Sequence, residues 1–420
     1  MRQLSPFGIR VRPPKETLLF FLGLVSTWQI LEFAGFSLST LMTLLTLGYL
    51  ILTRGMDFRK DPLLLLLIPA CVITTGVSLF AQLPAGYTKA AITGFVQRLA
   101  VLLTCLYACR DDRKGGDAFF EGFTLSCYVQ LGWCIAQLLL YKVASVDLNQ
   151  LLFSNLGQTS HYRGGTLVCT GLHWHAANLI PILVFVYFHR PSLVTKGLSI
   201  LVALGSKNAT GIIAVILCLG MDAVLFVWRT LADRQCSIPR RIAAWLVAAL
   251  CLLLVASPVL LPKVRSVLDY LLLRLYQAKN PSLGNESSAV HLSYYTLLPL
   301  ILTNIPLHEV IFGSGIGTSG WRFTQFNGQY PDKIWTVESD FTNILLSLGI
   351  VGLLLHIALF VLLIRRLAKE KQTGWICTLL VLVICGIAYS NQFLWVLLVE
   401  LMLYCTLAHP KKKGEPPHGA

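Results

Sequence analysis

Residues 341–364 decide the fold class of this chain, and they read FTNILLSLGIVGLLLHIALFVLLI. The stretch contains no Asp, Glu, Lys or Arg, and it is longer than the roughly 20 apolar residues that cross a bilayer as an α-helix. The whole chain of 420 residues has the same character, with 55% hydrophobic and only 13% charged residues and a mean hydropathy of +0.68. Soluble domains carry about 25% charged residues. We therefore predict an all-α, polytopic integral membrane protein.

Working outward from this stretch, we predict about 12 transmembrane helices. They cover residues 17–35, 36–53, 62–82, 91–109, 118–142, 171–188, 197–206, 209–228, 242–262, 341–364, 375–390 and 392–408. The domain organisation that follows is a first transmembrane region (1–262), one large extracytoplasmic loop (263–340), a second transmembrane region (341–408) and a basic cytoplasmic tail (409–420). A loop of that length inside a compact protein is usually functional.

Lysine and arginine gather in short clusters between the apolar segments and give a formal net charge of +14. The clusters lie at 2–15, 54–60, 110–114, 190–196, 229–241, 365–371 and 411–413. Because Lys and Arg are enriched in cytoplasmic loops, this spacing predicts that both termini are cytoplasmic. Clusters placed between membrane segments, rather than on one face of a soluble domain, argue against a nucleic-acid partner.

The seventh predicted span, 197–206, is short and is interrupted by Gly-Ser-Lys-Asn at 205–208. Polar, broken backbone at membrane depth is tolerated only where protein or a water-filled cavity surrounds it. The interruption indicates either a functional site or a plain re-entrant turn.

Arg98 is the charged residue placed deepest in a predicted span, about seven residues or roughly 10 Å into 91–109. An ionised side chain at such depth by default marks a site that faces the bundle interior. The alternative is a structural ion pair with Glu32 or Glu400.

Two further patterns resemble ligand motifs. The segment GIGTSG at 315–320 matches GxGxxG, but it lies in an external loop without the strand and helix of a dinucleotide site, so a structural turn or an anion-binding turn remains. The pair His173 and His175 has the wrong spacing for one helical face, and the 12 cysteines include no CxxC. We predict no metal and no cofactor.

The large loop contains the candidate catalytic residues. His291, Tyr294 and Tyr295 share one face of a predicted helix, and Glu338 precedes the tenth span together with Asp340. A histidine here can act as a base, donate a hydrogen bond to a phosphate or only cap local structure. Acidic residues at a helix start also complement the helix dipole.

The sequence around these residues resembles the bacterial O-antigen and capsular polysaccharide repeat-unit polymerases, which are relatives of the O-antigen ligases. The similar stretches are GNESSAVHLSYYTLLPLI, VIFGSGIGTSG and WTVESDFTNILLSLGIVG, which together cover the large loop and the tenth span. Ligases have Arg at the positions of Lys207 and His291 and His at the position of Glu338. These departures favour the polymerase branch.

The resemblance implies an inverting, metal-independent glycosyltransferase of the bacterial cytoplasmic (inner) membrane. Its donor is an undecaprenyl-pyrophosphate-linked oligosaccharide, and a chain-length regulator is a possible partner besides membrane lipids. Cations neutralise a departing pyrophosphate, and a positioned base activates an acceptor hydroxyl. We assign the pyrophosphate to Arg98, Arg163, Lys207 and Arg322.

His291 and Glu338 compete as the base, and Tyr295 supports whichever of them acts. Trp321, Tyr330 and Trp335 either stack on sugar rings or anchor the loop at the membrane interface. Two other functions remain open: an O-antigen ligase that uses a lipid A core or another acceptor, and a lipid-linked oligosaccharide transporter. A transporter is expected to show two related halves, and the sequence has no internal repeat.

Overall fold

The computed structural model describes residues 12–33, 36–55, 61–80, 83–154, 162–163, 166–173, 176–189, 191–207, 209–232, 242, 293–326, 337–388 and 394–409. About 81% of the structure is helical. In the described part, extended backbone is limited to two short antiparallel pairs. One joins β1 (Glu32–Phe33) to β2 (Phe36–Ser37), and the other joins β3 (Tyr162–Arg163) to β4 (Thr166–Leu167). The predicted all-α class is therefore confirmed.

The first set of helices precedes the large loop. It comprises α1 (Pro14–Val25), α2 (Leu38–Arg54), α3 (Pro62–Phe80), α4 (Ala85–Ala108), α5 (Lys114–Ala144), α6 (Leu148–Phe153), the 3-10 helix η2 (Ala176–Leu179), α7 (Ile180–His189), α8 (Leu193–Gly205) and α9 (Ala209–Ala232). The second set comprises α12 (Leu298–Asn304), α13 (Leu307–Phe312), α14 (Ser319–Thr324), α15 (Asp340–Lys369), α16 (Thr373–Ala388) and α17 (Leu394–Thr406). The predicted span 242–262 lies outside the described residues except for residue 242.

Within the part of the chain that the structure describes, four helices are long and apolar enough to cross a membrane: Pro62–Leu79, Gly86–Ala108, Lys114–Ala144 and Asp340–Lys369. Six further apolar helices among the described residues are shorter. Large apolar side chains such as Leu52, Leu66 and Leu354 point outward and are 87%, 58% and 59% exposed. Such a surface suits lipid rather than water, so these apolar helices indicate a membrane protein.

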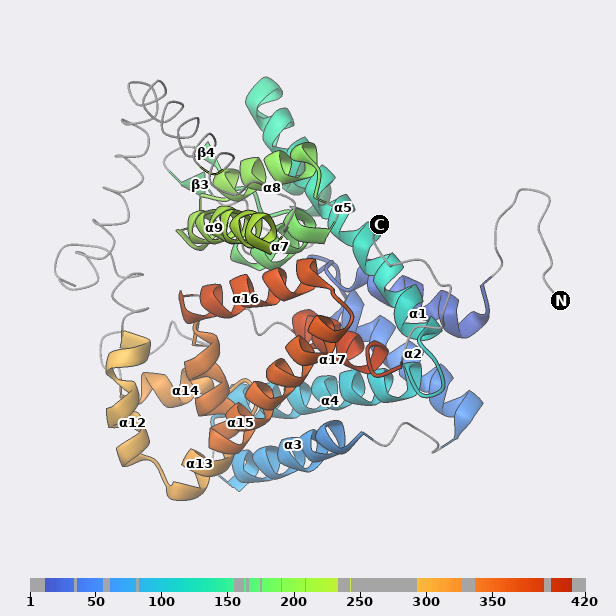
Figure 1. Ribbon diagram of the computed structural model, residues 1–420. Helices are drawn as coiled ribbons and strands as arrows, with labels where there is room; N and C mark the ends of the chain where they lie inside the picture. Colours follow the sequence, from blue (N-terminus) through green and yellow to red (C-terminus); the bar gives the residue numbers. More distant parts are fainter. Residues whose placement is uncertain are drawn as a thin grey trace.

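In Figure 1, α12, α13 and α14 lie together at one end of the molecule, and α1 lies at the other. We call the first the loop end and the second the terminal end. The starts of α4 and α15 lie at the loop end, and ion pairs join neighbouring elements at the terminal end. There, Arg113 binds Glu370 at 2.8 Å, and Arg366 lies 3.7 Å from Asp61.

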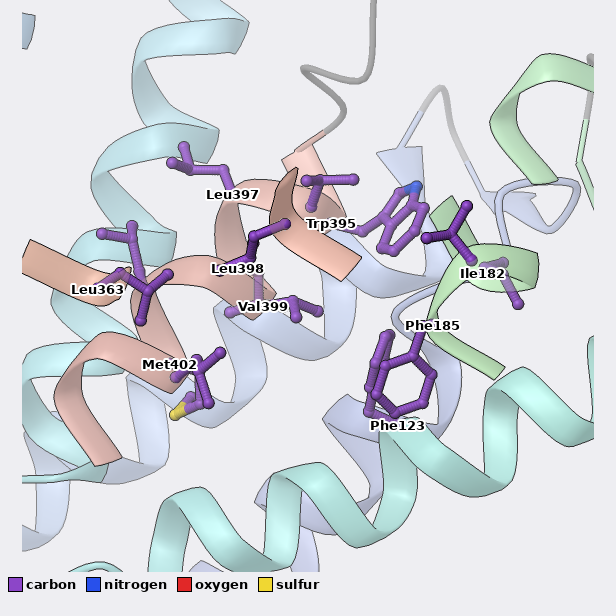
Figure 2. Close-up of a cluster of buried hydrophobic side chains, with 14 of the residues drawn as sticks. Phe123, Ile182, Phe185, Leu363, Trp395, Leu397, Leu398, Val399 and Met402 are labelled. Atoms are coloured by element: carbon purple, nitrogen blue, oxygen red, sulfur yellow. The ribbon is translucent and has the colours of Figure 1, made fainter. Parts of the chain in front are cut away.

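Small residues and an aromatic cluster hold the helices together. Gly23 in α1 and Gly122 in α5 let the two backbones touch, because a Cβ at either position would overlap a carbonyl oxygen of the other helix. Next to this contact, the ring centroids of Phe123 (α5) and Phe185 (α7) are 4.9 Å apart, and Trp395 (α17) lies 6.4 Å from Phe123. Figure 2 shows these rings packed beside the leucines of α17.

Helix α15 is broken inside its apolar stretch, where Gly349 has φ 68° and ψ −171°. The glycine-rich segment after α13 fills the break: Ser314 N–H donates to the Leu346 carbonyl at 2.9 Å, and Gly315 N–H donates to the Ser347 carbonyl at 3.1 Å. These bonds satisfy carbonyl groups that the helix itself leaves open. The break and the segment 313–315 are therefore one structural unit.

Candidate functional site

The start of α15 is the point where the separate pieces of the loop end meet. From α14, the Ser319 hydroxyl donates to Asn343 Oδ1 at 2.7 Å and accepts a hydrogen bond from the Val337 backbone N–H at 3.3 Å. Thr342 Oγ1 donates to the carbonyl oxygen of Tyr294 at 3.3 Å. Residues 337–343 thus contact both α14 and the helical residues 293–296.

Tyr295 and Ser339 make the central contact of this site. Their hydroxyl oxygens are 2.6 Å apart, and the Tyr295 hydroxyl also donates to the carbonyl oxygen of Ile387 in α16. Since a carbonyl only accepts and a phenol has one proton, Ser339 is the donor to Tyr295. Ser339 is the N-cap residue of α15, yet its side chain makes no capping bond within the helix. The hydroxyl is therefore used to position Tyr295.

Glu338 lies directly before this contact and is partly buried. Burial raises the pKa of its carboxyl above the ordinary value. Neighbouring Tyr294 is buried against Phe323, with ring centroids 5.0 Å apart, and its pKa is also raised, by burial first and then by the charge of Glu338. For Tyr295, burial is again the main cause of a raised pKa. A carboxyl group of raised pKa beside oriented hydroxyls is suited to exchange a proton with a substrate.

Of two further residues at this site, the sequence-based prediction gives Ser339 no role and gives Asp340 only an interaction with the helix dipole. Ser339 positions Tyr295. The carboxylate of Asp340 lies against Gly386 of α16, and any side chain at position 386 would overlap it. In the sequence, Ser339 is indicated only by its position next to Glu338. His291, the rival base, lies outside the described residues.

Two of the four predicted pyrophosphate ligands belong to neighbouring segments. Lys207 is exposed in the turn between α8 and α9 and adopts a left-handed φ of 48°. The carbonyl of Gly205, two residues earlier, accepts from Cys169 N–H at 3.3 Å, and Cys169 follows the β3–β4 pair that contains Arg163. Figure 1 shows β3 and β4 beside α8. The side chain of Arg163 lies outside the description.

Arg322 is held inside the protein. Its guanidinium forms a buried ion pair with Glu309 of α13, donates to Gln325 Oε1 at 2.6 Å and lies over the ring of Trp321 at 4.2 Å. Arg322 therefore joins α13 to α14. Its predicted contact with pyrophosphate stays a prediction. Tyr330 and Trp335 lie outside the described residues.

Arg98 lies deeper than the sequence indicates. Helix α4 begins at Ala85, thirteen residues before Arg98, which corresponds to about 20 Å along the axis rather than about 10 Å. The earlier start reflects residues 85–90, which are more polar than the predicted span 91–109 but continue the same helix. Among the side chains that the structure describes, none, Glu400 included, forms a hydrogen bond or ion pair with Arg98, and the side chain of Glu32 lies outside the description. It lines a cavity between α3, α4 and α15 instead.

The remaining motifs have structural positions. The segment 313–318 packs into the break of α15, so GxGxxG forms a buried turn. His173 is buried with Nδ1 3.2 Å from Gln29 Oε1, whereas residues 174 and 175 lie outside the description. Among the described residues, no three metal-ligating side chains come together.

In sequence comparisons, no protein-family description and no curated protein matches this chain.

Proposed function

We propose that this protein is a polysaccharide polymerase that joins undecaprenyl-pyrophosphate-linked oligosaccharide repeat units on the outer face of the bacterial cytoplasmic membrane. The observation that carries the proposal is the contact between Tyr295 and Ser339 beside Glu338. These residues come from two of the three stretches that resemble the repeat-unit polymerases, and the fold brings them to one place. Residues 313–318, from the third stretch, support the same helix.

The proposed topology has twelve spans with both termini in the cytoplasm. It is supported by the basic residues Arg113, Arg366 and Lys369, which lie at the terminal end where cytoplasmic charge is expected. The loop end then faces outward, as does the turn that carries Lys207. A lipid-linked donor assembled for export would meet Glu338 from that side.

In the proposed reaction, an acceptor hydroxyl of one glycan attacks C1 of another and displaces the lipid pyrophosphate with inversion. The bond from C1 to the pyrophosphate oxygen breaks, and the hydroxyl proton passes to the base. Glu338 in its carboxylate form is one base, and its raised pKa makes it a stronger proton acceptor; His291 is the other. Arg163 and Lys207 are the cations proposed to neutralise the leaving pyrophosphate. The reaction uses no metal or cofactor.

The test is reconstitution of the full-length protein in detergent with a synthetic undecaprenyl-pyrophosphate repeat unit, without nucleotide sugar or metal. We expect a ladder of products on a gel. Glu338→Gln is expected to abolish the ladder, whereas Glu121→Gln, at an exposed carboxylate that pairs with Arg12, is its matched control and should leave it unchanged. A normal ladder from both Glu338→Gln and His291→Ala would refute the assignment of the base.

Two other functions are separated by the same preparation. A ligase would give no ladder but would transfer one glycan to an added lipid A core acceptor. A transporter is favoured by one observation, the broken helix α15 next to a cavity that contains Arg98. It would move a fluorescent lipid-linked glycan across a liposome bilayer without forming any new glycosidic bond.

A further inference from the structure

Residues 169–172, between the β3–β4 pair and η2, are buried and belong to no helix or strand. Buried backbone of this kind needs partners other than a regular ladder for its N–H and C=O groups. Three side-chain amides supply them: Gln130 and Gln137 from α5 and Asn149 from α6. The three side chains are 0%, 1% and 3% exposed. We call residues 169–172 the amide-held segment.

Each amide bonds a different backbone group of the segment. Gln137 Oε1 accepts from the Gly171 N–H at 3.0 Å, and Gln130 Oε1 accepts from the Leu172 N–H at 2.8 Å. Asn149 Nδ2 donates to the Gly171 carbonyl at 2.8 Å. Gly171 has a left-handed φ of 62°, and a Cβ there would lie 2.7 Å from Gln130 Oε1. The segment is therefore fitted closely to α5.

The amide-held segment connects the two places that carry the proposed pyrophosphate cations. It continues from β4, whose partner strand β3 contains Arg163. At its first residue, the Cys169 N–H donates to the Gly205 carbonyl at 3.3 Å, two residues before Lys207. Gly205 also lies against α5, because a Cβ there would be 2.8 Å from Leu138. Both cation-bearing parts of the chain are thus held against one helix.

Polar side chains inside an apolar helix such as α5 are costly, and those that are kept commonly serve function. Apolar residues would pack α5 against its neighbours without that cost. The amides instead fix a stretch of backbone that apolar side chains could not hold. Cations stabilise a leaving group only when they are held where its charge develops, and a misplacement of about 1 Å can cost about a hundredfold in rate.

We propose that Gln130, Gln137 and Asn149 are positioning residues for the lipid pyrophosphate. They fix the amide-held segment and, through it, the places of Arg163 and Lys207. The inference rests on the proposed function, in which these two cations neutralise the leaving pyrophosphate. The amides themselves do not touch the substrate.

The first test is hydrogen–deuterium exchange of the full-length protein in detergent, read by mass spectrometry. Gln137→Met keeps the length of the side chain and removes the acceptor oxygen. We expect exchange at residues 203–208 to become faster by about tenfold or more, although the bonds of Gln137 in the described part do not include these residues. Unchanged exchange at 203–208 would overturn the proposal.

Ser126→Ala is the matched control for this test. It removes a buried hydrogen bond of the same helix, between Ser126 Oγ and Thr27 Oγ1 at 2.6 Å, without touching the amide-held segment. Exchange at 203–208 should stay as in the wild type. If Gln137→Met does not fold, Asn149→Leu, which removes the bond to the Gly171 carbonyl, carries the tests in its place.

The second test separates positioning from stability by a double-mutant cycle in chain extension. The ratio kcat/KM for the lipid-linked donor is measured for Gln137→Met, Lys207→Gly and the double variant. Because Gln137 acts through the cations, the double variant should lose much less than the product of the two single losses. Gln137→Glu keeps an acceptor oxygen and should recover most of the activity.

The outcomes distinguish this inference from the proposed function. Single losses that simply multiply, or a Gln137→Met protein with the kcat/KM of the wild type, would overturn the positioning role and leave the polymerase intact. A wild type that forms no ladder would refute the polymerase instead. Exchange at 203–208 would then still decide whether the amides position the α8–α9 turn.

Discussion

Among the described residues, two apolar helical regions are interrupted, one between α8 and α9 and one within α15, and the two interruptions differ in how they are supported. Between α8 and α9, the chain turns at Ser206 and Lys207. Lys207 is exposed there, and the turn receives one backbone hydrogen bond from another segment, from Cys169 to Gly205. In α15, Gly349 is buried, and two backbone hydrogen bonds from the segment 313–315 close the gap.

The difference shows that an interrupted helical region can either expose a side chain or accept another segment of the chain. The α8–α9 turn presents a cation at the surface, and a backbone hydrogen bond from Cys169 reaches the residue that precedes it. The α15 break accepts a second chain segment, and backbone contact requires glycine on both sides, because a Cβ at Gly313 would overlap Ser347 and one at Gly349 would overlap Ile311. We infer that substitutions at the α15 break affect folding, whereas those at the α8–α9 turn affect function.

The largest effect is expected from Gly349→Ala. Its φ of 68° is unfavourable for alanine, and the new Cβ meets backbone rather than a flexible side chain. Strain and overpacking together should cost about 3 kcal/mol or more of stability. The measurement is Tm and monodisperse yield in detergent.

Gly48→Ala is the control for this prediction, because a Cβ at that position in α2 meets nothing within 4 Å. It should be neutral or slightly stabilising, since alanine is the better helix former. Equal yields and Tm values for the two variants would mean that the α15 break tolerates a side chain and that the comparison above fails.

The next largest effect is expected at the ion pair between Arg322 and Glu309, which joins the helices on either side of the glycine-rich segment. Arg322→Met leaves Glu309 buried without a partner, which should cost about 3–5 kcal/mol. The double variant Arg322→Met, Glu309→Met should recover much of this loss, because it removes both charges. For the exposed pair Arg12–Glu121, the single substitution Arg12→Met should cost less than about 1 kcal/mol. Denaturation of all three variants checks the order, and an Arg322 variant as stable as the Arg12 variant contradicts it.

A smaller, pH-dependent effect is expected at Glu338. Its folded-state pKa is raised by burial, so the folded protein favours the neutral carboxyl more than the unfolded chain does. That contribution is fully present below the ordinary carboxyl pKa and is lost as the pH rises through the raised value. The wild type should therefore lose Tm relative to Glu338→Gln over this range. Parallel Tm curves for the two proteins between pH 4 and pH 8 would show that Glu338 is solvated.

The sequence predicts one of the two interruptions and misses the other for a physical reason. At 205–208, polar residues interrupt an apolar stretch, which is a local signal. Around Gly349, the sequence LGIVG stays apolar, and the helix opens only because residues 313–315 supply backbone donors from more than thirty positions away. Hydropathy predicts where α3, α5 and α15 lie, but it contains no information about such a distant partner.

The same distinction applies to the candidate site. Glu338 and Tyr295 can be selected one by one from the sequence, because Tyr295 shares a predicted helix face with His291 and Glu338 directly precedes an apolar span. The role of Ser339 follows from its contact with Tyr295, which lies 44 positions away in the sequence. The ion pair between Arg322 and Glu309 follows from the packing of α13 against α14. Residue type therefore predicts the candidates, and only packing decides which of them are available to a substrate.

The smallest effect on stability, and the sharpest test of the comparison, is expected from Lys207→Gly. Glycine adopts the left-handed φ of 48° without strain, so the loss of a Cβ there should change stability by less than about 1 kcal/mol. If the exposed turn serves to present a cation to the lipid pyrophosphate, the same variant should lose most of its chain-extension activity while its Tm stays near that of the wild type. Lys207→Arg is the companion variant, because it keeps the charge and should retain activity. A fully active Lys207→Gly protein would make the α8–α9 turn a structural feature like the α15 break, and the leaving-group role would then depend on Arg163.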